Sequence, residues 1–177
     1  VLIESFMYRT SVDLPPFQLH LVPDSDQETR PVAQELDASA WPHIMPYSYW
    51  GNWRSHFVLR STFQTPPTWD NEEPIALFLP LGESGDFSHP EAMVFLDGDP
   101  YAACDRHHQE VLLPENMFDG NSHQVTLFGW TGMGGRHNPE PGTQLFMRPC
   151  QLVRIHQPTR DFLATARVAL GAATTIE

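Results

Sequence analysis

The chain has 177 residues, 41% of them hydrophobic and 18% charged, which suits one globular domain with its own core and excludes a disordered chain. Ten arginines and no lysine stand against 22 acidic residues. The formal net charge of −12, with no basic stripe, argues against a nucleic acid or an anionic membrane as a partner. Seventeen prolines and eleven glycines argue against a helical bundle and favour short strands joined by turns.

Two further features bound the class of protein. The two cysteines, Cys104 and Cys150, cannot make a disulfide framework, and we expect both to be reduced and to lie in sheets. No apolar run approaches membrane-spanning length, and no signal peptide is visible. We therefore expect no membrane partner.

The first 40 residues are expected to form an N-terminal arm and an acidic spacer. Residues 1–9 are apolar, but this segment is too short to decide between helix and strand. Residues 17–22 alternate weakly and predict a strand that ends at a proline. Residues 24–40 are acidic and polar, with a short helix near residues 32–36.

Residues 41–157 are predicted to form a β-sandwich domain, because alternating or apolar segments are separated by Gly, Pro and Asp turns. The expected strands are, in chain order, 57–64, 75–81, 92–96, 101–104, 123–129 and 144–156. The third and fourth form a hairpin, since Asp97-Gly98 tolerates the positive φ that a tight turn needs. We expect the other strands to pair around this hairpin.

The predicted fold is all-β, an antiparallel sandwich followed by one helix. The residues expected in its core are Phe57, Leu59, Phe63, Leu77, Leu79, Val94, Leu96, Val125 and Leu127. A helix begins near Pro158 and runs to about residue 173, with Phe162 and Leu170 near one face. Residues 158–177 are therefore assigned to the start of a helical linker whose apolar face another domain or a second copy of the chain can cover.

The densest polar cluster is residues 105–110. On a strand, alternation places Asp105, His107 and Gln109 on one face, and Arg106, His108 and Glu110 on the other. Two ligands on one face do not complete a zinc site, so a small metal-dependent enzyme using His107 or His108 needs ligands from elsewhere. The other interpretation is a structural or interdomain polar edge with an Arg106–Glu110 pair.

Aromatic rings suit the apolar face of a pyranose sugar. Trp50, Trp53 and Trp130 are therefore candidates for sugar contact, as is Trp41. The alternative is that these large rings anchor the core of the sandwich.

The glycine-rich stretch 129–142 lacks the Lys-Ser/Thr of a phosphate-binding loop. We expect it to carry Arg136 and His137 close to a neighbouring domain. Asp97 and Asp99 flank a turn, where aspartate is common, so they receive no catalytic role.

Several motifs in order resemble the N-terminal non-catalytic domain of family 38 glycoside hydrolases, in the subgroup of yeast vacuolar and animal cytosolic α-mannosidases. They are 49–53 (Tyr-Trp-Gly-Asn-Trp), 74–82 (Pro-Ile-Ala-Leu-Phe-Leu-Pro-Leu-Gly), 90–98 (Pro-Glu-Ala-Met-Val-Phe-Leu-Asp-Gly), 105–113 (Asp-Arg-His-His-Gln-Glu-Val-Leu-Leu), 129–132 (Gly-Trp-Thr-Gly) and 151–162 (Gln-Leu-Val-Arg-Ile-His-Gln-Pro-Thr-Arg-Asp-Phe). The resemblance covers about residues 41–170.

The resemblance implies a jelly-roll-like, galactose-binding-domain-like sandwich that leads into an α/β catalytic barrel. In that family the barrel carries zinc, a His-x-Asp ligand motif and an aspartate nucleophile. No His-x-Asp occurs in this chain, so it receives no catalytic residue and no metal ligand, and zinc is expected only in the catalytic domain of the parent protein.

The resemblance also implies partners and a location. The partners are the chain's own catalytic domain and, through the parent, a mannose-containing oligosaccharide, and the helix face allows a homo-oligomer. The location is cytoplasmic or vacuolar. Besides the metal-dependent enzyme, the alternative function is a free-standing carbohydrate-binding module.

Overall fold

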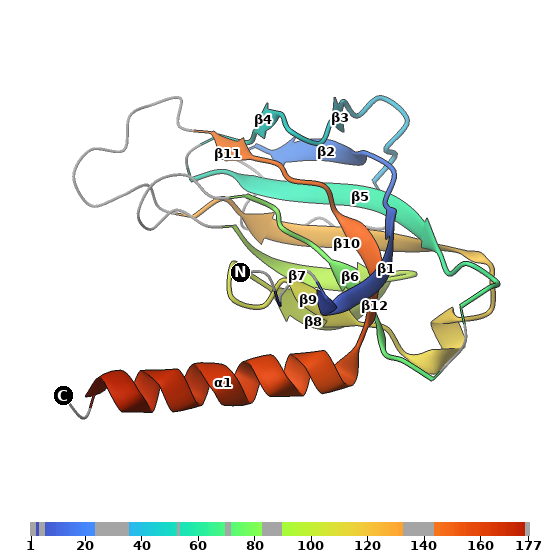
Figure 1. Cartoon of the computed structure of the whole chain (residues 1–177). Helices are drawn as coiled ribbons and strands as arrows, with labels where there is room; N and C mark the ends of the chain where they lie inside the picture. The colour runs from blue at the N-terminus through green and yellow to red at the C-terminus, as the bar shows by residue number, and fades with distance from the viewer. Residues whose placement is uncertain are drawn as a thin grey trace.

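The computed structural model describes residues 3, 6–23, 36–52, 54–69, 72–82, 90–132 and 144–175. Within these residues, antiparallel strands form a sandwich, and one long helix leaves it at the C-terminal end (Figure 1). The strands are β1 (Tyr8–Asp13), β2 (Phe17–Val22), β3 (His43–Ile44), β4 (Tyr49–Trp50), β5 (His56–Gln64), β6 (Ile75–Phe78), β7 (Glu91–Leu96), β8 (Asp99–Cys104), β9 (Glu110–Leu112), β10 (Ser122–Trp130), β11 (Leu145–Phe146) and β12 (Gln151–Ile155). The short 3₁₀ turn η3 (Glu115–Met117) precedes β10, and the helix is α1 (Gln157–Thr175).

Two main sheets make up the sandwich. One has the strand order β1-β12-β6-β9, the other has the order β3-β2-β5-β10-β7-β8, and β11 pairs with β4 beside them. All of the pairings given for these strands are antiparallel. The predicted all-β antiparallel sandwich with a C-terminal helix is therefore confirmed.

The core lies between the two sheets, and its predicted members are all buried. Each of the nine residues expected there is at most 3% exposed. Strands β5 and β10 lie side by side in the middle of the six-stranded sheet and supply many of these side chains. The alternation along each strand therefore predicted its buried face correctly.

The two central strands of the four-stranded sheet, β6 and β12, carry buried apolar residues on both faces. Along β6, Ile75 and Leu77 point into the main core, while Ala76 belongs to a second buried cluster with Val153 and Ile155 of β12. Successive residues of a strand point to opposite faces, so this second cluster lies on the outer face of the sheet. A sheet whose outer face meets water usually carries polar residues there.

The boundary expected at residue 41 is wrong. Strand β1 pairs with β12 from Tyr8 to Asp13, and β2 pairs with β5 from Gln18 to Val22. Residues 8–22 are therefore integral strands of the two sheets rather than an arm, because their backbone groups complete both ladders. The short helix expected near residues 32–36 falls outside the described residues except for Leu36.

The central hairpin forms as predicted but lies at an edge. Asp97 has φ 47° and Gly98 has φ 98°, the left-handed values that a tight hairpin turn needs. Strand β8 ends the six-stranded sheet, however, so the other strands do not pair around the hairpin. The ladder of β5 and β10 occupies the middle instead.

Two expected strands are shorter than predicted. Residues 144–156 form β11 and β12, which belong to different sheets and are separated by residues 147–150. Pro149 lies in this break, and it has no N–H to donate to a ladder. The segment 75–81 leaves the ladder after Phe78, shortly before Pro80.

Two smaller expectations concern the cysteines and the membrane. Both cysteines are free and buried, Cys104 at the end of β8 and Cys150 directly before β12 rather than in it. The described part of the chain has no helix that is both long and apolar enough to cross a membrane.

Candidate functional site

The polar cluster at 105–110 is a turn that leads into a strand. The Asp105 carboxylate accepts hydrogen bonds from the backbone N–H groups of His107 (2.6 Å) and His108 (2.8 Å), and the His108 ring Nδ1 lies 3.0 Å from it. These contacts, with the His108 ring first, lower the pKa of Asp105 to about 2. Aspartate commonly closes turns in this way, so the predicted alternation of residues 105–109 across two strand faces is wrong.

Glu110 fastens the helix to the sheet. Its carboxylate accepts a hydrogen bond from the Tyr8 hydroxyl at 2.7 Å and pairs with the Arg160 guanidinium of α1 at 2.9 Å. Burial, reinforced by the bond to Glu110, raises the pKa of Tyr8. The expected Arg106–Glu110 pair is not the one that the structure gives: Arg106 Nε donates to His107 Nε2 at 3.0 Å.

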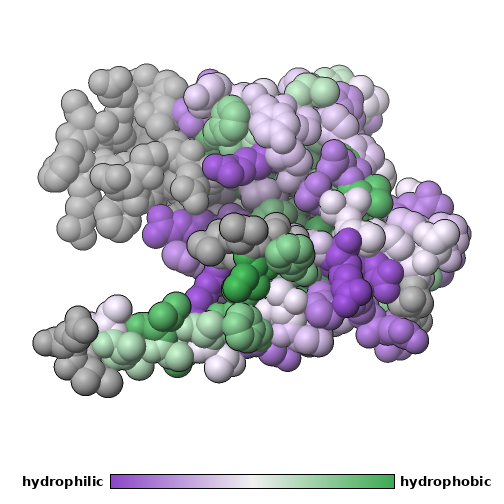
Figure 2. Space-filling view, in the orientation of Figure 1, coloured by the Kyte–Doolittle hydropathy of each residue, from purple (hydrophilic) through white to green (hydrophobic). Residues whose placement is uncertain are grey.

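A groove of about 710 Å³, which we call the helix groove, lies between α1 and the outer face of the four-stranded sheet. Its lining includes Tyr8, Phe78, Arg106, His107, His108, Arg160 and Arg167. Figure 2 shows α1 standing away from the sandwich, with apolar side chains along it and an open hollow beside it. The candidates His107 and His108 therefore both line this groove, beside a helix whose contact with them the sequence did not predict.

Metal chemistry at this groove finds no support in the geometry. Within the described ranges, no group of three or more His, Cys, Asp and Glu side chains is arranged to hold a metal ion. The His108 ring is instead hydrogen-bonded to the Asp105 carboxylate, and the His107 ring accepts a hydrogen bond from the Arg106 guanidinium.

The tryptophans behave differently from one another. Trp50 is 2% exposed, its indole N–H donates to the Leu81 carbonyl at 2.9 Å, and its ring packs edge-on against Phe57. It is a core residue, so its assignment to sugar contact is wrong. Trp130 is half-buried and donates to the Glu91 carboxylate at 3.0 Å. Trp53, Arg136 and His137 lie outside the described residues.

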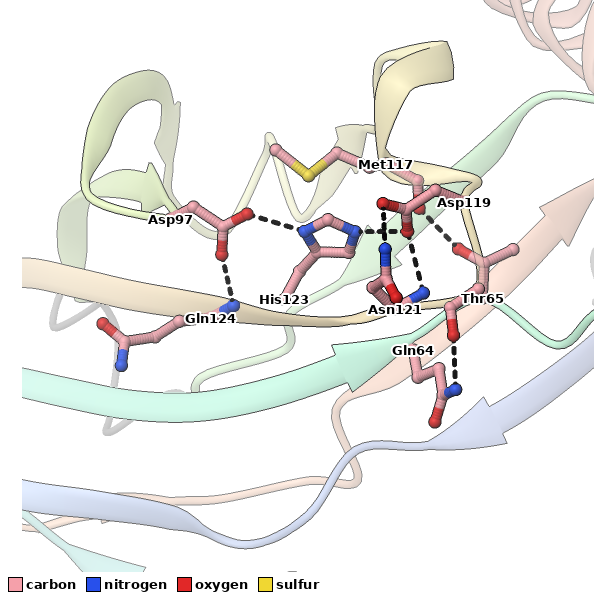
Figure 3. A network of polar contacts seen from close by, with 9 residues as sticks. Gln64, Thr65, Asp97, Met117, Asp119, Asn121, His123 and Gln124 are labelled. Atoms are coloured by element: carbon pink, nitrogen blue, oxygen red, sulfur yellow. Dashed lines mark hydrogen bonds and ion pairs between the residues drawn. The ribbon is translucent and has the colours of Figure 1, made fainter.

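A histidine held between two aspartates is a feature that the sequence analysis missed. His123 Nδ1 lies 2.6 Å from an Asp97 oxygen, and Nε2 lies 2.9 Å from an Asp119 oxygen (Figure 3). The ring stacks on Phe63 with centroids 5.5 Å apart. A neutral imidazole has only one N–H, whereas the protonated ring donates to both carboxylates. A spacing of 26 residues between His123 and Asp97 gives no local sequence signal.

The electrostatics of this cluster favour the charged histidine. Burial alone lowers the pKa of His123, but the two carboxylates outweigh it and the net shift is upward. Burial alone raises the pKa of Asp97, and hydrogen bonds from His123 and from the Gln124 N–H bring it below its usual value. The pKa of Asp119 falls to about 2, chiefly through the Asn121 N–H and then through His123.

This cluster predicts a pH window for stability. The raised pKa of His123 stabilises the fold fully below its ordinary value of 6.5, and the gain is lost as pH rises through the folded pKa. The lowered pKa values of Asp97 and Asp119 stabilise the fold above pH 3.8, and this stabilisation is lost as pH falls through the folded pKa values. We expect the contribution to peak between these pH values and to be modest, because the carboxylates are exposed and screened by solvent.

Urea denaturation from pH 4 to 9 measures this contribution in the wild type and in His123→Gln. The stability difference between the two proteins should be largest near pH 5 and should shrink above neutrality. His107→Gln is the matched control, since that ring is exposed. A difference that is constant with pH would contradict the charged cluster.

No family model and no curated protein matches the sequence. Among solved structures, the chain is similar to the β-glucuronidase from Ruminococcus gnavus in complex with C6-substituted uronic isofagomine, with a TM-score of 0.52 and 13% identity over 84% of this chain and 29% of that chain. The same enzyme in complex with D-glucuronic acid gives a TM-score of 0.51 and 13% identity over 84% of this chain and 30% of that chain. The chain thus spans less than a third of the length of these proteins, and at this identity the similarity establishes its fold alone.

Proposed function

We propose that the chain is a non-catalytic β-sandwich domain of a glycoside hydrolase, and that its parent is a family 38 α-mannosidase that hydrolyses terminal α-mannosides of oligosaccharides. The observation that carries the proposal is the exposed apolar surface of α1 beside the outer face of the four-stranded sheet. On that outer face Ala76, Val153 and Ile155 form a second buried cluster, which Met7, Tyr8 and Phe78 of the same chain cover. Such a sheet is suited to packing between two layers.

The helix supports the same conclusion. Its side chains are all at least partly exposed, and Phe162, Val168 and Leu170 are largely exposed. Most helical stability in proteins comes from the packing of an apolar face. In this chain alone the apolar side chains of α1 are not packed in this way. The occupant of the helix groove and of this face is, in the proposal, the catalytic domain that follows.

Charge narrows the description of that partner surface. Arg106, Arg160 and Arg167 line the helix groove of a chain whose net charge is −12, and Glu110, which pairs with Arg160, is the one acidic side chain among the described lining residues. The partner surface is therefore expected to be apolar at its centre and acidic at its rim. In this proposal the zinc site and the nucleophile belong to the catalytic domain. The proposed parent is a cytoplasmic or vacuolar protein that forms a homo-oligomer.

The comparisons support the general part of the proposal and the motifs support the specific part. The similar β-glucuronidases are much longer than this chain, as a parent with a separate catalytic domain would be. The ordered motifs between residues 49 and 162 favour α-mannosidases among the glycoside hydrolases.

The test compares this chain with the product of the whole reading frame that contains it. The chain alone, supplied with zinc, should not hydrolyse an aryl α-mannoside above a mock-purified control, whereas the longer protein should. Phe162→Asp should leave the stability of the chain alone unchanged, because the ring is 58% exposed. In the longer protein the same change should cost about 1.5–3 kcal/mol, the value of burying one phenylalanine.

Thr165→Asp is the matched control, because it adds the same charge at an exposed polar position of α1. Thermal unfolding and aryl α-mannoside turnover are measured for all three forms of each protein. Turnover by the chain alone would overturn the non-catalytic assignment. Equal stability of the Phe162→Asp and Thr165→Asp forms of the longer protein would overturn the helix contact, and turnover of an aryl β-glucuronide in place of the α-mannoside would overturn the α-mannosidase assignment.

A further inference from the structure

A second groove, distinct from the helix groove in most of its lining, has a volume of about 510 Å³ and is called here the tyrosine groove. Tyr47 and Phe146 supply aromatic surface to it, and Gln109, Arg148 and Gln151 supply polar groups. Its volume lies within the usual range of small-ligand pockets, about 300–1,000 Å³. Among the described residues that line this groove, the largely exposed aromatic ring is that of Tyr47, and no tryptophan is present.

The backbone around this groove is held in uncommon conformations. Tyr47 has φ 63°, a left-handed value that costs a non-glycine residue energy, and its N–H is fixed by a 2.8 Å hydrogen bond to the Met147 carbonyl. Gly82 has φ 113°, and a Cβ there would collide with the backbone carbonyl of Phe146. The wall of the groove thus has a position that only glycine fits, Gly82, and a residue in a strained backbone conformation, Tyr47. Backbone strain of this kind is concentrated at ligand sites.

The ring of Tyr47 is presented to solvent rather than packed. It is 70% exposed, although the groove beside it has half-buried Phe146 and Phe78. An exposed aromatic face offers a flat apolar surface, and Tyr adds a hydroxyl that can donate or accept. This combination fits a ligand with one apolar face and a hydroxylated edge.

The polar side chains of the groove have capacity to bind such an edge. Within the described segments, the side chains of Gln109 and Arg148 make no hydrogen bond or ion pair with the protein. The Gln151 amide nitrogen donates to Asp13 at 2.7 Å, which leaves its carbonyl oxygen as an acceptor. Amide and guanidinium groups together supply both donors and acceptors for vicinal hydroxyls.

We propose that the tyrosine groove binds one neutral hexopyranosyl residue, with the ring of the sugar on Tyr47 and its hydroxyls on Gln109, Arg148 and Gln151. The chain's net charge of −12 disfavours an anionic ligand. Arg148 is the one charged side chain among the described residues that line the groove, and its guanidinium donates equally to the hydroxyls of a neutral sugar. This binding goes beyond the proposed function, since it needs neither the catalytic domain nor its zinc.

The experiment titrates the chain alone with methyl α-D-mannopyranoside, methyl α-D-glucopyranoside and D-glucuronic acid, followed by amide chemical shifts. A neutral glycoside should bind saturably with a Kd of about 1 mM or tighter, and shifts should centre on residues 47, 109, 148 and 151. D-Glucuronic acid should bind at least about tenfold more weakly than the better neutral glycoside.

Tyr47→Ala and Arg148→Ala should each weaken binding by about tenfold or more, with unchanged unfolding midpoints. Tyr101→Ala is the matched control, because Tyr101 is an exposed tyrosine on β8 outside the groove and should leave the Kd unchanged. Absence of saturable shifts with every sugar, equal affinity of wild type and Tyr47→Ala, or preference for the uronic acid would overturn the proposal. None of these outcomes bears on turnover by the longer protein, so the two proposals fail separately.

Discussion

Replacing Gly129 by alanine is expected to destabilise the chain by about 3 kcal/mol, the upper end of the usual range for overpacking. Gly129 lies in β10 and pairs with Phe57 on one side and Ala92 on the other. A Cβ at this position would collide with the carbonyl oxygen of Glu91 and lie 2.8 Å from both Cα and Cβ of Ala92. Since the carbonyl oxygen and the Cα are backbone atoms, relief requires β7 to move away from β10 and weakens their shared ladder.

Urea denaturation of wild type and Gly129→Ala measures the effect, and Gly171→Ala is the matched control. An added Cβ at Gly171 meets nothing within 4 Å, and alanine favours a helix over glycine by about 0.5–1 kcal/mol. We therefore expect no loss of stability from Gly171→Ala. A loss below about 0.5 kcal/mol for Gly129→Ala would show that β7 and β10 do not approach as closely as the structure has them.

The strands were predictable where one local signal sufficed. Period-two alternation identified the buried faces of β5 and β10, and Asp97-Gly98 identified the hairpin turn between β7 and β8. Which strands become neighbours depends on contacts far apart in sequence. The pairing of β1 with β12 joins the two ends of the sandwich, and no pattern within residues 1–9 indicates it.

The candidate sites were less predictable because a residue type does not reveal its exposure. Trp50 and Tyr47 belong to the same aromatic block, yet the first is buried and the second is exposed at a groove. Tyr47 lies in a left-handed turn and its N–H is bonded to Met147 from another part of the chain, a contact that the local sequence does not indicate. Likewise, the polar residues that begin at Asp105 were predicted to form a strand. Instead, the Asp105 carboxylate accepts hydrogen bonds from the N–H groups of His107 and His108 and closes a turn.

Replacing Leu79 by alanine should cost about 2–5 kcal/mol, the range observed when a buried leucine is truncated. Leu79 is fully buried in the main core directly after β6. Its N–H donates to the Gln109 carbonyl at 2.8 Å, which joins the end of β6 to the turn before β9. This hydrogen bond fixes the backbone on both sides of the side chain, so we expect only partial collapse of the surroundings and a loss in the upper half of that range.

Leu170→Ala is the matched control for this change, because it removes the same atoms from a position that is largely exposed on α1. Its effect on the chain alone should stay within about 0.5 kcal/mol. Because Leu79 precedes Pro80 and Gly82, which both line the tyrosine groove, its truncation should also loosen that wall and weaken sugar binding, whereas Leu170→Ala should not. Unfolding midpoints and sugar titrations of both variants measure this directly. A Leu79→Ala protein as stable as Leu170→Ala would contradict the burial of Leu79 between the two sheets.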